Sequence, residues 1–331
     1  MKALRTHAVG GPDTLTLDDV DVPTPGKGEV LVDVKACAIN FPDTLMIRDL
    51  YQFKPERPYS PGGELAGTVS AIGEGVTGYA VGDRVMAGVG NGGLAEKVVV
   101  PAGRMFPVPE GLSFEKAASL LMTYGTTIHG FKDRGHIKQG DTVLILGAAG
   151  GVGLSAVELA KAFGARVVAA VSTEEKGQVA RNAGADEVVI YPKDEMDKAA
   201  SKELAAAFKA ACGPEGANIV YDIVGGQYSE PALRSIAWEG KFLVVGFPAG
   251  IAKMPLNLTL LKSCDICGVF WGAFTAREPV KFKAQVEELF QLMQVGKIDP
   301  LVSETFPLER GGDAIAKLES RQAVGKVVVT M

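Results

Sequence analysis

The sequence lacks the features that would place the protein outside the cell or in a membrane. It has only four cysteines, too few for a disulfide framework in a chain of 331 residues. No apolar run reaches the roughly 18 residues that a membrane-spanning helix needs, and the N-terminal MKALRTHAVG has no signal-peptide core. We therefore expect a cytoplasmic protein without a membrane partner.

A strong excess of one charge sign is also missing. The formal net charge is −5, from 34 basic and 39 acidic side chains, which disfavours a nucleic-acid partner. Glycine, in contrast, is abundant, and the 41 glycines stand mostly at the ends of apolar runs. This placement indicates many turns between strands and helices, in a chain long enough for two domains.

The chain changes its pattern twice. Residues 1–119 consist of short β-branched runs broken by glycine and proline, which is typical of an all-β barrel or sandwich. From residue 120 strands such as DTVLILG and RVVAAVS alternate with helices, which predicts a parallel α/β sheet. After residue 258 this alternation stops, and the remaining helix and strand are too short to form a core. We predict one domain of residues 1–119 with 259–331, and a second of residues 120–258.

The stretch LILGAAGGVGLSAVELAK carries the strongest chemical signal. It follows a predicted strand, opens a predicted helix, and has Ala148, Gly150 and Gly153 where the dinucleotide fingerprint has its small residues. The N–H groups at the start of such a helix bind phosphate. We therefore assign pyrophosphate binding to Ala148, Gly150, Gly151, Val152 and Gly153.

The acidic residue that marks an NAD site is missing from the end of the next strand. An Asp or Glu there would hold the ribose 2′-hydroxyl, but the strand ends in Val171-Ser172-Thr173. Ser172 and Lys176 could bind a 2′-phosphate instead, and we expect Glu174 and Glu175 to face solvent. The sequence therefore predicts NADPH as the cofactor.

Three segments resemble a known family over essentially the whole chain. INFPDTLMIRDLY, MPLNLTLLKSCDICGVFWG and AIAKLESRQAVGKVVV are similar to segments of the zinc-independent quinone oxidoreductases of the medium-chain dehydrogenase/reductase superfamily. The resemblance implies an α/β protein with a GroES-like β-rich catalytic domain and a Rossmann-type, doubly wound parallel-sheet cofactor domain. It also implies a homodimer, and it makes INFPDTLMIRDLY the segment that carries Asn40, Asp43 and an active-site tyrosine, here Tyr51.

The zinc ligands of the metal-dependent relatives are not found in this sequence. Those relatives have a Cys, a His in a GHE triplet and a third ligand, and the matching positions are Asn40, Gly63 and the neighbourhood of Met122. Zinc needs a close shell of thiolate, imidazole or carboxylate ligands. We expect no metal, and we expect Glu64, in YSPGGELAG, to be a structural carboxylate.

The resemblance implies further cofactor contacts, and several residues leave two interpretations open. Phe270 and Trp271 could line the nicotinamide or belong to the core, and Asp222 could shape the cofactor site or cap a loop. Cys264 and Cys267 form a CxxC in an apolar run, which we interpret as buried structural cysteines. The cofactor set also includes Tyr191, Phe247, Arg321 and Lys326.

Together these features predict a zinc-free, NADPH-dependent reductase that transfers hydride to a quinone or another conjugated carbonyl. Without a metal, the developing oxyanion needs neutral hydrogen-bond donors, for which the candidates are Asn40, Tyr51 and Thr127. One alternative is an enone or enoyl-thioester reductase, since Arg48, Lys54 and Arg57 could bind the phosphates of an acyl-CoA. Another is a non-catalytic NADPH-binding protein of the lens-crystallin type.

Overall fold

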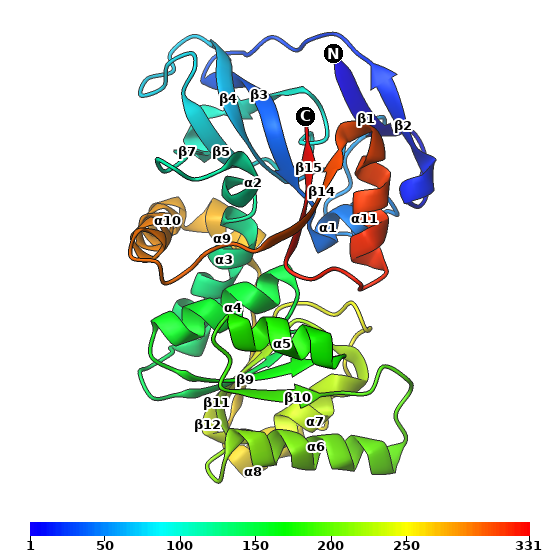
Figure 1. The fold of residues 1–331 in the computed structure, drawn as a ribbon, viewed down its shortest axis with the longest axis vertical. Helices are drawn as coiled ribbons and strands as arrows, with labels where there is room; N and C mark the ends of the chain where they lie inside the picture. The colour runs from blue at the N-terminus through cyan, green and yellow to red at the C-terminus, as the bar shows by residue number, and fades with distance from the viewer. The chain divides into compact units, whose positions relative to one another are not determined.

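The computed structural model describes every residue from Met1 to Met331, and the chain forms two compact units (Figure 1). Unit 1 comprises Met1–Met122 and Pro300–Met331, and unit 2 comprises Thr123–Asp299. No helix in either unit has the length and apolar character needed to cross a membrane.

Unit 1 is built on a seven-stranded sheet in the order β14-β15-β3-β4-β5-β7, and β6 pairs with β3. The C-terminal strand β15, drawn in red, lies antiparallel beside the blue β3, with Val328 opposite Ala38 (Figure 1). Alternate residues of β3 such as Val30, Val32 and Val34 are buried in the core. A separate two-stranded sheet is formed by β1 and β2. The strands of unit 1 are β1 (Lys2–Thr6), β2 (Leu15–Asp19), β3 (Glu29–Ala38), β4 (Glu64–Ile72), β5 (Arg84–Gly88), β6 (Lys97–Pro101), β7 (Met105–Pro107), β14 (Val302–Pro307) and β15 (Lys326–Thr330).

Short helices connect these strands. The helix α1 begins directly after Asn40, and α11 near the C-terminus contributes Ala314 and Ile315 to the same core. The helices are η1 (Pro12–Thr14), α1 (Phe41–Met46), η2 (Ala102–Arg104), α2 (Phe114–Ala117), η5 (Leu308–Arg310) and α11 (Gly311–Glu319).

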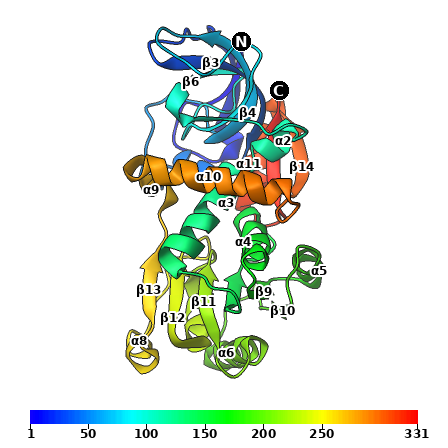
Figure 2. The same cartoon turned by 90° about the vertical axis from the view of Figure 1, so that its left-hand side faces the viewer.

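Unit 2 contains a six-stranded parallel sheet in the order β10-β9-β8-β11-β12-β13. Figure 2 shows β13, β12 and β11 side by side. The central strand β8 is continuously apolar because helices cover both faces, and its residues Val143 to Leu146 are fully buried. The strands are β8 (Thr142–Leu146), β9 (Arg166–Val171), β10 (Glu187–Ile190), β11 (Ala217–Asp222), β12 (Ile236–Val244) and β13 (Asp265–Gly268).

The helices of unit 2 follow the strands in the predicted alternation. The first, α3, begins in unit 1 and continues across the boundary at Thr123. The helices are α3 (Leu121–Ile128), η3 (His129–Gly135), α4 (Gly151–Ala162), α5 (Glu174–Asn182), α6 (Lys198–Cys212), η4 (Gly226–Tyr228), α7 (Ser229–Arg234), α8 (Asn257–Lys262), α9 (Trp271–Arg277) and α10 (Pro279–Gln294).

The predicted fold class is confirmed, but the predicted division of the C-terminal segment differs from the observed one. We assigned residues 259–331 to the β-rich unit, whereas only residues 300–331 belong to it. The reason is that β13 extends the parallel sheet, with Lys241 opposite Asp265 and Val244 opposite Gly268. The helix α10 stays in unit 2 as well, where Gln285 donates to Asp133.

Candidate functional site

The loop between β8 and α4 has the geometry of a phosphate-binding turn. Gly147 has a φ of +74°, which favours glycine, and Gly150 is the extended N-cap residue of α4. A Cβ at Gly153 would lie 2.2 Å from the Gly147 carbonyl oxygen and 2.7 Å from Ala148 Cα. The helix therefore packs so closely on the loop that only glycine fits there. The first N–H groups of such a helix have no intrahelical partners and can bind an anion.

The end of β9 presents a hydroxyl and two neighbouring lysines. Ser172 follows the strand, and Thr173 caps α5 by accepting from the Lys176 N–H at 3.3 Å. Lys176 is half-buried, which lowers its pKa, and the charge of Lys193 lowers that pKa further. An anion between two such lysines would relieve their repulsion. Lys193 was not predicted, although it follows β10, whose end lies beside that of β9.

The two acidic residues of this segment are not buried beside that anion site. Glu174 and Glu175 are both exposed in the first turn of α5, as expected. Glu174 forms an ion pair with Arg181 at 2.5 Å. The Arg181 charge is therefore compensated on the same helix.

The predicted aromatic cofactor contacts differ in exposure. The Tyr191 ring is buried against Tyr228, with a centroid distance of 4.6 Å. Trp271 packs edge-on against Phe282 at 5.5 Å, and its indole Nε1 is buried without a hydrogen-bond partner. Trp271 is thus part of the packing of unit 2. Two others, Phe247 and Phe270, are 47% and 56% exposed and free to contact a ligand.

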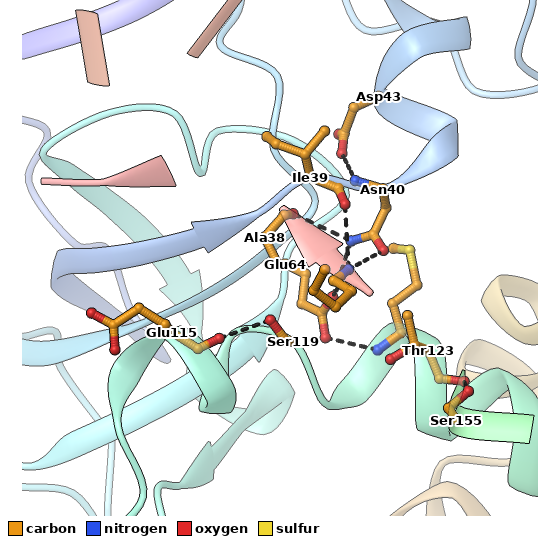
Figure 3. Close-up of polar contacts among 11 residues, drawn as sticks. Ala38, Ile39, Asn40, Asp43, Glu64, Glu115, Ser119, Thr123 and Ser155 are labelled. Atoms are coloured by element: carbon orange, nitrogen blue, oxygen red, sulfur yellow. Dashed lines mark hydrogen bonds and ion pairs between the residues drawn. The ribbon is translucent and has the colours of Figure 1, made fainter. Parts of the chain in front are cut away.

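Unit 1 contains a buried polar cluster around Glu64, the first residue of β4 (Figure 3). Glu64 is 1% exposed, and its Oε1 accepts from the Met122 backbone N–H at 2.8 Å. Its Oε2 accepts from Asn40 Nδ2 at 3.0 Å and lies 3.6 Å from Lys326 Nζ. Burial raises the pKa of Glu64, and the Lys326 charge opposes that rise. Since Met122 is in the first turn of α3, Glu64 serves as a capping carboxylate for that helix.

Lys326 is the buried cation of this cluster. It is 4% exposed, and its Nζ donates to Asn40 Oδ1 at 2.6 Å and to the Ile39 carbonyl at 3.3 Å. Burial lowers the pKa of Lys326, and the Glu64 charge opposes that shift. The ammonium group therefore binds only protein groups, through two hydrogen bonds and the ion pair with Glu64. We expected Lys326 to contact the cofactor, and the structure places its ammonium group against protein groups instead. The neighbouring Arg321 is exposed.

The side-chain N–H groups of Asn40 are also both used by protein acceptors. Its Nδ2 donates to the Ala38 carbonyl at 3.3 Å and to Glu64, and its side chain takes part in the capping box of α1 with Asp43. Asp43 in turn accepts from the N–H groups of Asn40 at 2.8 Å and Gly62 at 3.0 Å. Burial raises the pKa of Asp43 to about 6. Asn40 has no free donor for a substrate oxyanion.

The other two predicted donors have opposite environments. The Thr127 hydroxyl is fully buried in unit 2 and contacts Thr123 O, Ser155 Oγ and the Tyr221 hydroxyl at 2.9, 2.7 and 3.1 Å. Tyr51 is partly exposed, and its hydroxyl makes no hydrogen bond. Burial raises the pKa of Tyr51, and the Asp43 charge adds to the rise. Tyr51 is therefore protonated at neutral pH and can donate.

The cluster around Glu64 does not fit a zinc ion. Both Glu64 oxygens already accept N–H groups, and the Lys326 ammonium stands where a cation would bind. A Cβ at Gly63 would lie 3.1 Å from the Gly90 carbonyl oxygen, so a larger side chain there would be crowded. No three His, Cys, Asp or Glu side chains in residues 1–331 are grouped to hold a metal.

The arginines that could have bound an acyl-CoA are paired within unit 1. Arg48 donates to both carboxylate oxygens of Glu319, at 2.7 and 3.0 Å. Arg57 donates to Asp49 at 2.8 Å and to the Ile47 carbonyl at 3.1 Å. Of the three predicted cations only Lys54 stays on the surface without such a pair.

The structure favours one of the two interpretations of Asp222, and the expected burial of the CxxC is found for Cys264 but not for Cys267. Asp222 accepts from the N–H groups of Val224 and Gly225 at 2.9 and 2.8 Å and from the Ser229 hydroxyl at 2.5 Å, which makes it a loop-capping residue. Both cysteines of the CxxC are free thiols; Cys264 is buried and Cys267 is partly exposed.

Two family models match this chain. The alcohol dehydrogenase GroES-like domain matches residues 26–110, and the zinc-binding dehydrogenase model matches residues 151–293. Quinone oxidoreductase-like protein 2 of Rattus norvegicus is 37% identical over 96% of this chain and 89% of its own. The quinone oxidoreductase of Lama guanicoe is 32% identical over 100% of this chain and 98% of its own.

Solved structures agree with these matches. The Escherichia coli quinone oxidoreductase complexed with NADPH has a TM-score of 0.89 at 30% identity, covering 100% of both chains. The mycobacterial protein Rv1454c complexed with NADPH has a TM-score of 0.92 at 34% identity, also covering 100% of both. The predicted resemblance is confirmed: the chain belongs to the medium-chain dehydrogenase/reductase superfamily, in its quinone oxidoreductase branch.

Proposed function

We propose that the protein is a zinc-independent, NADPH-dependent reductase that transfers hydride to a quinone or another conjugated carbonyl. The observation that carries this proposal is Tyr51, a protonated phenol without a hydrogen-bond partner in a region where the donors of Asn40 and Lys326 are already used. A single neutral donor suits a reaction whose oxyanion is stabilised by conjugation. An isolated alkoxide would require a stronger electrophile.

The cofactor part of the proposal rests on unit 2. NADPH supplies hydride from C4 of its nicotinamide when it is bound. The N–H groups at the start of α4, in residues 151–153, would hold the pyrophosphate beside Ala148 and Gly150, and Ser172 with Lys176 and Lys193 would hold the 2′-phosphate. Two structural relatives are complexes with NADPH, which supports this choice. Tyr191, Phe247, Phe270 and Arg321 stay proposed cofactor contacts.

The residues of unit 1 would manage the charge that the reaction creates. As hydride adds to the electrophilic carbon, an electron pair moves to the carbonyl oxygen and forms an enolate; with a quinone, loss of a proton from that carbon and protonation of oxygen then give the hydroquinone. The Tyr51 hydroxyl donates a hydrogen bond to this oxygen and can transfer its proton to it. The Glu64–Lys326 pair keeps its charges within the protein and takes no part in the step.

The pairing of Arg48 with Glu319 and of Arg57 with Asp49 favours an uncharged acceptor over an acyl-CoA. We expect the purified protein to oxidise NADPH with 1,4-benzoquinone or a simple enone at a higher kcat/KM than with crotonyl-CoA. A higher kcat/KM for crotonyl-CoA would contradict the proposed substrate class. Tight NADPH binding without turnover of any of the three would instead favour a non-catalytic, crystallin-like role.

Replacing Tyr51 tests its role as the donor. Tyr51→Phe should lower kcat by about 10²–10³, the usual effect of losing one oxyanion donor, and leave the KM for NADPH unchanged. Tyr79→Phe is the matched control in unit 1, because the Tyr79 hydroxyl donates to the Met105 carbonyl. An unchanged kcat in Tyr51→Phe would remove Tyr51 from the mechanism.

Replacing Lys176 tests the selection of NADPH over NADH. Lys176→Ala should raise the KM for NADPH at least about tenfold, as expected for a lost hydrogen bond to a charged group. The KM for NADH should not change, because NADH has no 2′-phosphate. Arg181→Ala on the same helix should leave both values unchanged, since Arg181 is paired with Glu174. An equal change of both KM values in Lys176→Ala would contradict this assignment.

We also propose that the protein is a homodimer that pairs through β13. This strand is the edge of the six-stranded sheet, and Ile266 on it is 37% exposed. Leu260 and Leu261 of α8, which precedes β13 in the chain and contacts β12, are 79% and 62% exposed and add apolar surface. Edges of this kind are covered in stable proteins, and a second copy of the chain would cover this one.

Sedimentation equilibrium tests the homodimer. The unchanged chain should sediment as a dimer, and Leu260→Asp with Ile266→Lys should shift it to a monomer because charges would be buried at the interface. Val280→Asp is the control, since Val280 on α10 is 84% exposed outside this edge. A monomer in the unchanged chain, or an equal effect of Val280→Asp, would contradict the proposed interface.

A further inference from the structure

We propose that Tyr221, Thr127 and Ser155 form a buried hydroxyl chain that positions the phosphate-binding loop at the start of α4. This inference rests on the proposed NADPH site and assigns Thr127 a positioning role in place of the predicted catalytic one. The three side chains come from β11, α3 and α4, all in unit 2. All three are fully buried, with 0% exposure.

The distances define a continuous chain. The Tyr221 hydroxyl lies 3.1 Å from Thr127 Oγ1, which lies 2.7 Å from Ser155 Oγ. Ser155 Oγ reaches the Val152 carbonyl at 2.9 Å and the Thr123 carbonyl at 3.2 Å. Figure 3 shows Ser155 beside Thr123. The hydroxyl chain thus ends on the Val152 carbonyl, in the first turn of α4.

The number of hydrogens leaves none for a ligand. Each hydroxyl has one donor hydrogen, and Thr127 is the only partner of the Tyr221 hydroxyl, which therefore donates to it. Thr127 donates in turn to Ser155, because Ser155 uses its own hydrogen for a carbonyl. All three hydrogens of the hydroxyl chain are used within the protein, so none of them can be donated to the substrate.

The loop itself has no polar side chain that could fix its position. Residues 147–153 read GAAGGVG, and Ser155 is the first polar residue after them. The loop has only backbone bonds, such as those from the N–H groups of Gly147 and Ala148 to the Ala170 carbonyl at 2.9 and 3.2 Å. Its orientation therefore depends on how α4 is held, and Ser155 links α4 to α3 through Thr127 Oγ1 at 2.7 Å and the Thr123 carbonyl at 3.2 Å, beside its contact with the Val152 carbonyl of its own helix.

A comparison of the Kd values for two ligands distinguishes positioning of the phosphate-binding loop from a general effect on stability. The probes are NADPH, which has the pyrophosphate, and adenosine 2′-monophosphate, which lacks it. In the full chain, Tyr221→Phe and Thr127→Val should each raise the Kd for NADPH about five- to tenfold, the usual effect of one lost hydrogen bond. The Kd for adenosine 2′-monophosphate should stay within about twofold. Thr127→Ser keeps the hydroxyl and should restore NADPH binding.

Tyr124→Phe is the matched control. The Tyr124 hydroxyl of α3 donates to Glu158 Oε2 at 2.7 Å, which also joins α3 to α4 but lies farther along the helix. This variant should leave both Kd values within about twofold of the unchanged chain. Tyr221→Phe removes only an oxygen atom and serves if Thr127→Val does not fold, which melting curves will show.

Several results would overturn the inference. They are an equal loss of affinity for the two probes, an equal effect of Tyr124→Phe on NADPH, and unchanged NADPH binding in both Tyr221→Phe and Thr127→Val. Failure of the unchanged chain to bind NADPH is a separate result, since it overturns the proposed cofactor and with it the ligand that the loop is inferred to hold.

Discussion

A buried ion pair between Glu64 and Lys326 is the interaction on which the candidate site of unit 1 depends. Glu64 begins β4 and Lys326 begins β15, the two strands that flank β3 in the sheet. The pair also holds α1 through Asn40 and the start of α3 through the Met122 N–H. Removing two charges from water costs several kcal/mol for each, so such a pair persists only where hydrogen bonds complete it. Here both partners have those bonds.

This pair determines what chemistry is left for the rest of the site. Because Asn40, Lys326 and Glu64 satisfy one another, they offer neither a metal shell nor a free donor for the substrate. Of the three predicted donors Tyr51 alone keeps an unused proton, and its raised pKa keeps that proton in place at neutral pH. One neutral donor is enough for an oxyanion that is delocalised by conjugation. The buried pair and the proposed substrate class therefore follow from the same arrangement.

The sequence predicted those parts of the molecule that local pattern controls. The alternation of apolar strands with helices predicted the parallel sheet, and the spacing of Ala148, Gly150 and Gly153 predicted the phosphate turn. The placement of β13 was missed because joining a sheet edge is a long-range choice that a four-residue strand does not encode. Glu64 was expected to be structural and its oxygens contact only protein groups, but its partner Lys326 is distant in sequence and was assigned to the cofactor.

The donors show a second limit of sequence reasoning. Asn40, Tyr51 and Thr127 are all neutral side chains that can donate a hydrogen bond, and only their surroundings distinguish them. The hydrogens of Asn40 and Thr127 are used by neighbours that come from other strands and helices, whereas the Tyr51 hydroxyl has no such neighbour. Residue type establishes which atoms can donate, and packing decides which of them is available.

The metal content of the purified full-length chain tests most directly whether the Glu64–Lys326 pair takes the place of a metal at this site. The protein would be purified without chelators, assayed for NADPH oxidation with its best acceptor, and analysed by inductively coupled plasma mass spectrometry. Zinc far below one atom per chain, with full activity, is the predicted result. One tightly held zinc per chain, whose removal abolishes activity, would contradict it.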